Sequence, residues 1–296
     1  GPTIAEHANQ KVKDEIIPKI LKGEIVIAIG YSESEAGTDL ASLKTKAIYE
    51  NNNWLINGQK MWTILAEYSD YIWLAVRTNP RTGDHKGLSI ILVPNNSEGI
   101  SITPINTLGD VRTNATFYDN VVVSGEFLIG TKDKGWELIT SQLNRERLSL
   151  VNNAPLEKIL EDVIDWAKKA ITNNGNKLIE EDWVQNNLAK VQSGTEALKL
   201  LCWKQAWAMT ENELNMADAS VAKVYGSEFF IEAYRLLMEV LGEQSLLTQK
   251  SEQNVLEGRL EMLYRVSSIL TFGGGTNEIQ RDIISMAGLS MPRTKR

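Results

Sequence analysis

The stretch Thr271-Phe-Gly-Gly-Gly-Thr-Asn-Glu-Ile-Gln-Arg281 joins three consecutive glycines to the start of a helix. Glycine carries no Cβ atom, so another group can approach this backbone closely. Thr276 is the expected N-cap of a helix that runs to about Ala287. Such a junction can offer free N–H donors to an electron-rich group, although the same pattern also occurs in plain turns. The stretch therefore indicates either a binding loop or a plain turn, and motifs elsewhere in the chain are needed to distinguish the two.

The composition narrows the class of protein. Of the 296 residues, 43% are apolar and 23% are charged, which is ordinary for a globular chain. The net charge of −7 and the lack of a basic cluster argue against a nucleic-acid partner. No apolar run reaches the ~20 residues of a membrane span, and no charged-then-apolar leader is visible. We therefore expect a location in the cytoplasm or in an organelle matrix.

Metal and cysteine chemistry are not expected. The single cysteine, Cys202, excludes an internal disulfide, and its place in an apolar helical pattern favours packing over nucleophilic catalysis. The two histidines, His7 and His85, are far apart in polar surroundings. A histidine metal site or a catalytic triad is therefore not predicted.

The first part of the chain is rich in strand signals. Residues 5–22 are typical of a short polar helix, from Glu6 to Leu21, that is interrupted at Pro18 and has too few apolar positions to form a domain. Within residues 23–134, Asn57-Gly58 lies between two β-rich runs and predicts a hairpin turn. The predicted strands are Ile25–Ile29, Lys44–Tyr49, Trp54–Ile56, Tyr71–Val76, Leu88–Val93 and Thr116–Val123.

Residues 135–296 follow a helical period instead. One buried helix face is predicted from apolar residues at i, i+3, i+4, i+7, i+8 and i+11, namely Leu156, Ile159, Leu160, Val163, Ile164 and Ala167. Further helices are expected over 182–210, 217–242 and 253–269. The predicted fold class is α+β, with a domain of short antiparallel strands at 23–134 followed by a four-helix-type bundle at 135–296.

Two more motifs precede the glycine-rich stretch, Tyr31-Ser-Glu-Ser-Glu-Ala-Gly-Thr-Asp39 and Asn57-Gly-Gln-Lys-Met-Trp62. In this order and spacing, the three motifs resemble the acyl-CoA dehydrogenase family. That family has a helical domain, a central β-domain and a four-helix bundle, with FAD between the last two. The resemblance covers these last two parts. It implies a fragment or an N-terminally shortened relative, in which residues 1–22 are the remnant of the first domain.

The resemblance implies that several residues of the β-domain bind FAD. Tyr31 and Ser32 match positions that lie against the flavin ring. Gly37 and Thr38 match residues that hold FAD and face the thioester of the substrate. Trp62, Thr63 and Ile64 match the segment that covers the other face of the ring, whereas Trp62 taken alone is also typical of core packing at a strand end.

The resemblance extends to the bundle, with departures from the family pattern. Thr276 and Glu278 match FAD contacts, and Gly242 matches a strip that meets the FAD of a neighbouring subunit. The segment Gly175–Glu181 lacks the Arg-x-x-Phe that grips the pyrophosphate and is acidic instead. Either FAD binds more weakly, or its contacts come from another chain. The β-domain loop Glu33–Gly37 also lacks a proline and a glycine that the family has there.

The chemistry of the family needs a base for the α-proton of an acyl thioester, and burial in an apolar pocket raises a carboxylate pKa to suit this task. Most members keep this glutamate where the present chain has Gly274. A minority place it on the first bundle helix before an arginine, which matches Glu146 and Arg147. Arg147 would then contact substrate and orient the carboxylate while lowering its pKa, and Pro155 is expected to kink the helix. A glutamate between arginines is otherwise typical of an ion-paired surface residue.

Two functions remain open. The first is FAD-dependent dehydrogenation of an acyl-CoA to the trans-2-enoyl-CoA, with Glu146 as base and the backbone N–H of Gly274 polarising the thioester oxygen. The resemblance implies fatty-acid or steroid side-chain β-oxidation, and an electron-transferring flavoprotein or similar acceptor. The second is a weakly active or non-catalytic partner subunit of a heteromeric dehydrogenase. In both cases a dimer or tetramer of like or unlike chains is expected.

Overall fold

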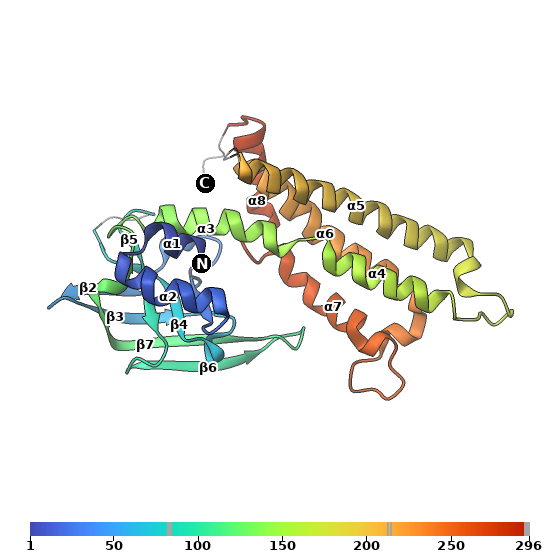
Figure 1. Cartoon of the computed structure of the whole chain (residues 1–296), viewed down its shortest axis with the longest axis horizontal. Helices are drawn as coiled ribbons and strands as arrows, with labels where there is room; N and C mark the ends of the chain where they lie inside the picture. The colour runs from blue at the N-terminus through green and yellow to red at the C-terminus, as the bar shows by residue number, and fades with distance from the viewer. Residues whose placement is uncertain (82–84, 212, 214, 293–296) are drawn as a thin grey trace. The chain divides into compact units, whose positions relative to one another are not determined.

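The computed structural model describes residues 1–81, 85–211, 213 and 215–292, with the backbone alone at 144, 145 and 148. The chain divides into two compact units, Gly1–Leu143 and Asn144–Arg296. The first is a sheet with helices and the second is helical, and the boundary falls inside helix α3 (Gly135–Leu150) (Figure 1). The predicted α+β fold class is confirmed, while the finer division at residue 22 stays a prediction.

The first unit is built on a mixed sheet with the strand order β6-β7-β3-β2-β4-β5-β8, and β1 pairs with β4. Most neighbours are antiparallel, as predicted, but β1 and β2 both run parallel to β4. The strands are β1 (Ile27–Gly30), β2 (Lys46–Glu50), β3 (Asn53–Lys60), β4 (Tyr71–Arg77), β5 (Leu88–Pro94), β6 (Ile100–Asn106), β7 (Arg112–Ser124) and β8 (Leu128–Ile129). Short 3-10 turns lie at Leu40–Ser42, Ala66–Tyr68 and Gly125–Phe127.

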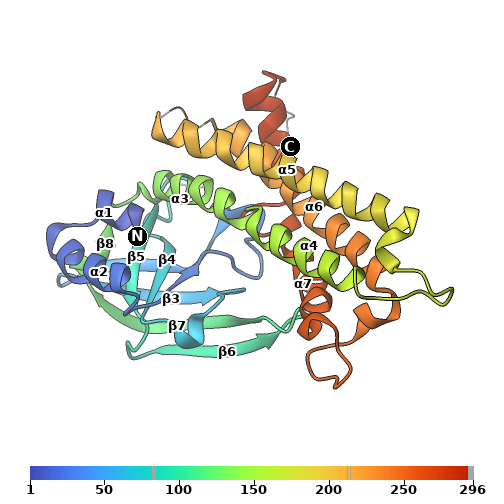
Figure 2. The same cartoon turned by 45° about the vertical axis from the view of Figure 1, so that its right-hand side comes forward.

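Both faces of the central strands are buried. Side chains alternate along a strand, so on β4 Trp73 joins one core cluster and Leu74 the other. Helices α1 (Pro2–His7) and α2 (Gln10–Lys22) supply Ile4 and Ile16 to the cluster that contains Trp73. They lie beside the sheet in both views (Figures 1 and 2). The apolar runs of β4 and β5 thus reflect strands covered on two sides.

The prediction of one N-terminal helix interrupted at Pro18 is wrong in its position. The break lies between α1 and α2, where the Asn9 side chain accepts a hydrogen bond from the Val12 N–H at 3.0 Å. This N-cap satisfies one of the free amides at the start of α2. Pro18 lies inside α2, and both Pro18 and Asp14 are exposed, so water can reach the Asp14 carbonyl that the proline leaves unpaired.

The predicted hairpin at Asn57-Gly58 is also wrong. Strand β3 runs through both residues, and the turn between β2 and β3 lies at Asn51 and Asn52, which have φ of 49° and 63°. Gly58 sits at a register shift in the pairing of β3 with β7. A Cβ atom there would lie 2.7 Å from the Thr45 Cα. Glycine at this position therefore serves a bulge and a close backbone approach, and not a turn.

Strand β6 was not predicted. It lies at one edge of the sheet and pairs with β7 alone. Pro104 is paired opposite Asn114 within it. Proline lacks an N–H and is tolerated in a sheet only where no partner needs that donor, as at an edge. Because proline argues against a strand, the sequence of this segment did not predict one.

The second unit is a helical bundle. The prediction of helices over 182–210 and 217–242 is confirmed by α5 (Asp182–Thr210) and α6 (Met216–Leu241). The helix predicted over 253–269 is regular only in α7 (Arg259–Ser267). Helix α8 (Asn277–Ile283) follows the glycine-rich stretch. Further short turns are at Leu178–Glu180, Gly242–Leu246, Leu256–Gly258, Ser268–Thr271 and Ile284–Gly288.

Helix α4 (Ala154–Ala167) carries the predicted buried face. Its core-facing residues Leu156, Ile159, Leu160, Val163 and Ala167 are at most 3% exposed, and Ile164 packs against the same core. The expected kink at Pro155 is wrong, because α3 has already ended at Leu150 and Pro155 occupies the first turn of α4. Cys202 packs partly buried against this core, and burial raises its pKa, which fits a packing role.

None of the helices in the described ranges has the length and apolar character needed to cross a membrane. In the same ranges, no group of three or more His, Cys, Asp or Glu side chains could hold a metal ion.

Candidate active site

The loop Tyr31–Thr38 follows β1 and closes through a tight turn. Glu33 and Ala36 exchange both backbone hydrogen bonds, at 3.0 and 3.2 Å, so only two residues form the tip. Gly37 and Thr38 beyond it are exposed, and the space beside Gly37 is open. The loop is therefore ordered by its own backbone pairing, although it lacks the proline and glycine of the family pattern.

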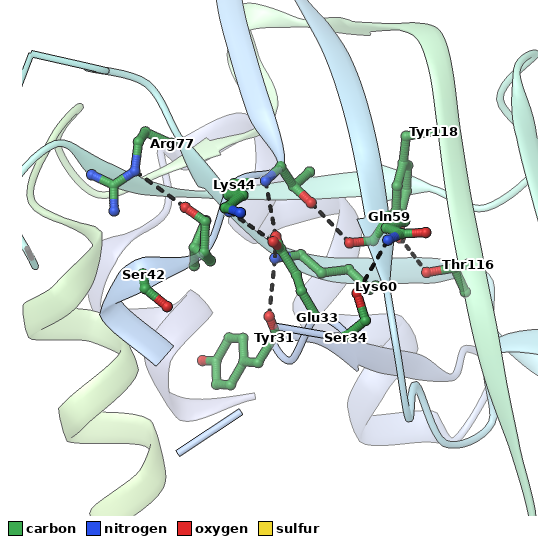
Figure 3. A network of polar contacts seen from close by, with 12 residues as sticks. Tyr31, Glu33, Ser34, Ser42, Lys44, Gln59, Lys60, Arg77, Thr116 and Tyr118 are labelled. Atoms are coloured by element: carbon green, nitrogen blue, oxygen red, sulfur yellow. Dashed lines mark hydrogen bonds and ion pairs between the residues drawn. The ribbon is translucent and has the colours of Figure 1, made fainter. Parts of the chain in front are cut away.

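A buried ion pair supports this loop (Figure 3). The Lys60 ammonium of β3 lies 2.8 Å from the Glu33 carboxylate, and these side chains are 0% and 7% exposed. Lys60 also donates to the Tyr31 carbonyl at 2.9 Å. The Glu33 carboxylate accepts from the backbone N–H of Lys44 at 2.7 Å and of Thr45 at 2.9 Å. One carboxylate thus joins the loop to β3 and to the segment that leads into β2.

The charges of this pair stabilise each other against burial. Burial lowers the pKa of Lys60 to about 8, and the neighbouring Glu33 carboxylate opposes that change. Burial by itself raises the pKa of Glu33. The Lys60 charge and the hydrogen bonds from Lys60, Thr45 and Lys44 lower it by more, so the net pKa lies below its ordinary value. Both groups are therefore charged at neutral pH.

Tyr31 directs its hydroxyl into the unit. The side chain is 8% exposed, and its hydroxyl donates to Gln142 Oε1 at 2.8 Å and accepts from Trp73 Nε1 at 2.9 Å. The next residue, Ser32, accepts a hydrogen bond from the Met61 N–H at 2.8 Å. The start of the loop is therefore fixed to the segment at the end of β3. The flavin contacts of Tyr31 and Ser32 stay predictions.

The segment Trp62–Ile64 presents apolar side chains outward. Trp62 is 56% exposed and Ile64 is 40% exposed, whereas Thr63 between them is 1% exposed. Thr63 and Asn114 exchange hydrogen bonds at 2.9 Å through their backbone and the Asn114 side chain, which anchors the segment to β7. Leu65 adds a third exposed side chain at 48%. We call Trp62, Ile64 and Leu65 the apolar ledge. A plain packing role for Trp62 does not fit this exposure.

In the second unit, two buried cations hold the glycine-rich loop Thr271–Thr276. Arg147 of α3 is 7% exposed, and its Nε donates to the Gly274 carbonyl at 3.2 Å. Lys223 of α6 is 0% exposed and donates to the carbonyls of Thr271 at 3.2 Å and Gly275 at 2.8 Å. In the part of the chain that the structure describes, the N–H of Gly274 donates to no protein acceptor. The N–H groups of Gly275 and Thr276 likewise donate to no acceptor among the described residues, so this part of the loop keeps several backbone donors open.

The loop leads into α8 as the sequence predicted. The Thr276 hydroxyl accepts a hydrogen bond from the Ile279 N–H at 3.3 Å, which confirms its role as N-cap. Glu278 lies exposed in the first turn of α8. Gly242 ends α6 with φ of 60° and is exposed. The FAD contacts assigned to these three residues stay predictions.

Glu146 and Gly274 belong to neighbouring parts of this unit. Glu146 is half-buried on α3, directly before the arginine that binds the Gly274 carbonyl. Burial lowers the pKa of Arg147, and the Glu146 carboxylate raises it. Gly274 has φ of +68°, and a Cβ atom there would lie 2.9 Å from Leu150 Cδ1. A side chain at 274 is therefore strained, and a glutamate base does not fit there without movement.

The sequence reasoning missed Lys60, Gln142 and Lys223. Lys60 stands at the end of a strand, and Gln142 stands in the middle of a helix, so neither has a local signal. Lys223 did have a local signal in the sequence, because it is spaced with Ala219 and Gly226 along the buried side of α6. A lysine on a core-facing stripe indicates a specific polar partner, since a buried charge must be compensated.

Comparison with known proteins agrees with this arrangement. Residues 28–121 match the acyl-CoA dehydrogenase middle domain, and residues 133–289 match the acyl-CoA dehydrogenase C-terminal domain. The chain belongs to the acyl-CoA dehydrogenase family, whose members are oxidoreductases that are generally FAD-dependent.

Among its relatives, the chain is 46% identical to acyl-CoA dehydrogenase FadE26 of Mycobacterium tuberculosis, over 100% of this chain and 76% of that protein. Its fold is similar to a chain of the ChsE4-ChsE5 complex from Mycobacterium tuberculosis, with a TM-score of 0.92 and 47% identity over 99% of this chain and 76% of that one. It is likewise similar to the Tcur3481-Tcur3483 steroid ACAD, with a TM-score of 0.94 and 42% identity over 99% and 75% of the two chains.

Proposed function

We propose that the assembled protein catalyses FAD-dependent α,β-dehydrogenation of an acyl-CoA thioester to the trans-2-enoyl-CoA. The observation that carries this proposal is the open N–H of Gly274 on a loop held by Arg147, the residue directly after Glu146. An open backbone donor can polarise the thioester oxygen, which makes the α-proton more acidic. The Glu146 carboxylate is the base that removes this proton. FAD, when bound, accepts the hydride that leaves the β-carbon.

The residues of each unit suit a flavin. The apolar ledge around Trp62 offers exposed aromatic and aliphatic surface of the kind that packs on a planar ring. The open space at Gly37 allows close approach of a cofactor to the backbone. We assign FAD binding to Tyr31, Ser32, Gly37, Thr38, Trp62, Thr63, Ile64, Gly242, Thr276 and Glu278, and further substrate contacts to Thr38 and Arg147.

We further propose a bulky acyl group, of the steroid-side-chain type, and an electron-transferring flavoprotein or a similar protein as acceptor. Support for the acyl group comes from the similarity to a structure described as a steroid ACAD, at 42% identity. The acceptor is an inference from the family alone.

The proposal predicts that the purified protein carries flavin and that acyl-CoA bleaches it. Absorbance of the flavin band is recorded anaerobically before and after adding a steroid-side-chain acyl-CoA and, separately, a straight-chain acyl-CoA. We expect loss of the band with at least the bulky substrate, because the α-proton goes to Glu146 and the hydride to the cofactor. Assembled protein that takes up FAD but is never bleached supports a partner-subunit role. Protein that takes up no FAD contradicts the proposal altogether.

We also propose that the protein assembles with a second chain of the same family. Helix α5 carries an exposed apolar stripe formed by Leu200, Trp203 and Trp207, which are 61%, 60% and 60% exposed. These residues are spaced to lie along one helix face. Exposed aromatic residues of this size mark interaction surfaces, since tryptophan is enriched in protein interfaces. The similarity to the two-component ChsE4-ChsE5 complex is consistent with such a partner.

Replacing Trp203 and Trp207 with glutamine is expected to raise the dissociation constant of this assembly by at least about tenfold, since tryptophans that become buried in an interface are frequent hot spots. Sedimentation velocity over a range of concentrations measures the change. Trp183→Gln is the matched control, because Trp183 is 47% exposed on the same helix but about 30 Å away along its axis. Equal assembly of the parent and the double variant would show that the stripe is not the interface.

A further inference from the structure

Lys223 is a fully buried lysine that the proposed chemistry does not use. Its ammonium donates to the Thr271 carbonyl at 3.2 Å, to the Gly275 carbonyl at 2.8 Å and to Asn277 Oδ1 at 2.7 Å. These acceptors lie at the start of the glycine-rich loop, near its end and in the first turn of α8. A single cation on α6 therefore ties both ends of the loop to one helix.

The neighbouring groups complete this anchor. The Asn277 side chain donates to Ser227 Oγ at 3.0 Å and to Glu228 Oε1 at 3.2 Å, and both partners lie on α6. Arg147 holds the Gly274 carbonyl between the two contacts of Lys223. The carbonyls of Thr271, Gly274 and Gly275 thus all accept from buried cations, which fixes the direction of three peptide groups.

We propose that Lys223 is a positioning residue for the Gly274 N–H, holding the glycine-rich loop in the conformation that leaves this donor open to the thioester oxygen. The inference rests on the proposed function. Gly274 and Gly275 have φ of +68° and +101°, and glycine can leave such conformations at little cost. Oxyanion-type donors are effective only when they are fixed before the reaction. The anchor supplies the rigidity that the glycines lack.

The charge state of Lys223 follows from the groups around it. Burial and the Arg147 charge from α3 lower the pKa of Lys223 to about 8, against Glu278 of α8 and Glu228 of α6, which raise it. The ammonium has three donors for its three acceptors, whereas the neutral amine has two. Above its pKa, one acceptor of the anchor therefore loses its hydrogen bond.

The fold itself is not expected to weaken in this pH range. Because the folded pKa lies below the ordinary lysine value of 10.5, the unfolded chain binds more protons between the two values. The contribution of this group to the free energy of unfolding therefore increases as the pH rises through that window. Activity should fall above about pH 8 while stability does not, which separates loop positioning from general unfolding.

The experiment replaces Lys223 with methionine, which keeps the aliphatic volume and removes the ammonium. In protein without added FAD, hydrogen exchange should become faster in peptides that cover Phe272 and Gly273, whose amides donate to the Ile269 carbonyl. In flavin-loaded protein, acyl-CoA should reduce the flavin on the order of 10²-fold more slowly, with a much smaller change in substrate affinity. Lys204→Met is the matched control, because Lys204 is 61% exposed on α5.

The pH profile gives a second readout. The parent should lose rate above about pH 8, and Lys223→Met should lose this pH dependence. Lys60 titrates in the same range, so the loss of rate belongs to Lys223 only if the Lys223 variant removes it. Unchanged loop exchange with an unchanged rate and profile overturns the proposal.

Two further outcomes remain decisive. If the parent protein shows no flavin reduction, the proposed function fails, while the exchange measurement still tests the anchor. If the methionine variant does not fold, the parent is measured at about pH 7 and about pH 9.5, with exchange corrected for base catalysis. Opening of the loop alone leaves Lys223 buried on α6 with fewer acceptors, so its pKa is lower in the open loop than in the closed one and the proton favours the closed loop. Protection of the loop should therefore fall at the higher pH, and unchanged protection contradicts the anchor.

Discussion

Replacing Glu146 with glutamine is expected to slow flavin reduction by acyl-CoA by about 10²–10⁴-fold while FAD stays bound. Glutamine keeps the size and hydrogen-bonding capacity of glutamate but cannot accept the α-proton, and loss of a general base typically costs this much. The backbone of Gly274 and the guanidinium of Arg147 remain in place, so binding of the thioester should change little. Stopped-flow absorbance of the flavin band measures the rate.

Glu137→Gln is the matched control for this variant. Glu137 lies on the same helix, α3, and forms an ion pair with Lys134 at 3.8 Å on the exposed surface. It should reduce flavin at the parent rate. If Glu146→Gln also keeps the parent rate, Glu146 is an ion-paired residue, and the partner-subunit role becomes the better explanation of this chain.

The second large effect is expected on stability. Glu33→Gln should lower the free energy of unfolding by about 3–5 kcal/mol, because it leaves the buried Lys60 ammonium without its counter-ion. In glutamine an NH2 group replaces one carboxylate oxygen, and this group cannot accept the hydrogen bond that the oxygen received from the backbone N–H of Lys44 or Thr45. Urea unfolding measures the change. Because the pair closes the loop Tyr31–Thr38, FAD affinity should fall in the same variant.

Two comparisons separate the buried pair from surface charge. Glu35→Gln removes the neighbouring ion pair with Lys44, whose side chains are 71% and 74% exposed, and should have no measurable effect. Adding Lys60→Met to Glu33→Gln should recover part of the loss, because no unpaired charge then remains. A Glu33→Gln variant as stable as Glu35→Gln would contradict the role of the pair.

The pH dependence of stability has a definite sign at Glu33. Its folded pKa lies below the ordinary value of 4.5, so the stabilisation is complete above that value. As the pH falls through the folded pKa, the unfolded chain binds more protons and this contribution is lost. Glu33→Gln should therefore show a shallower loss of stability in acid than the parent does.

Much of the architecture was visible in local patterns. Helices over 182–210 and 217–242, the buried face of α4 and the cap at Thr276 follow from periodicity and capping rules that need no distant residue. The same rules failed where one signal has two meanings. Asn57-Gly58 is typical of a turn, yet Gly58 is required because the Thr45 backbone lies against it. Only the pairing of β2 with β3 distinguishes these cases.

The sequence by itself determined the fold class, the family and the candidate site residues, because each of these depends on short motifs that occur in a set order along the chain. The tertiary structure alone decided what holds these motifs in place. Lys60 is 27 residues from Glu33, and Lys223 is 52 residues from Gly275, so no local pattern links them. A buried charge is tolerated only where folding brings compensating groups to it. That condition depends on three-dimensional packing, and it is met here at both loops.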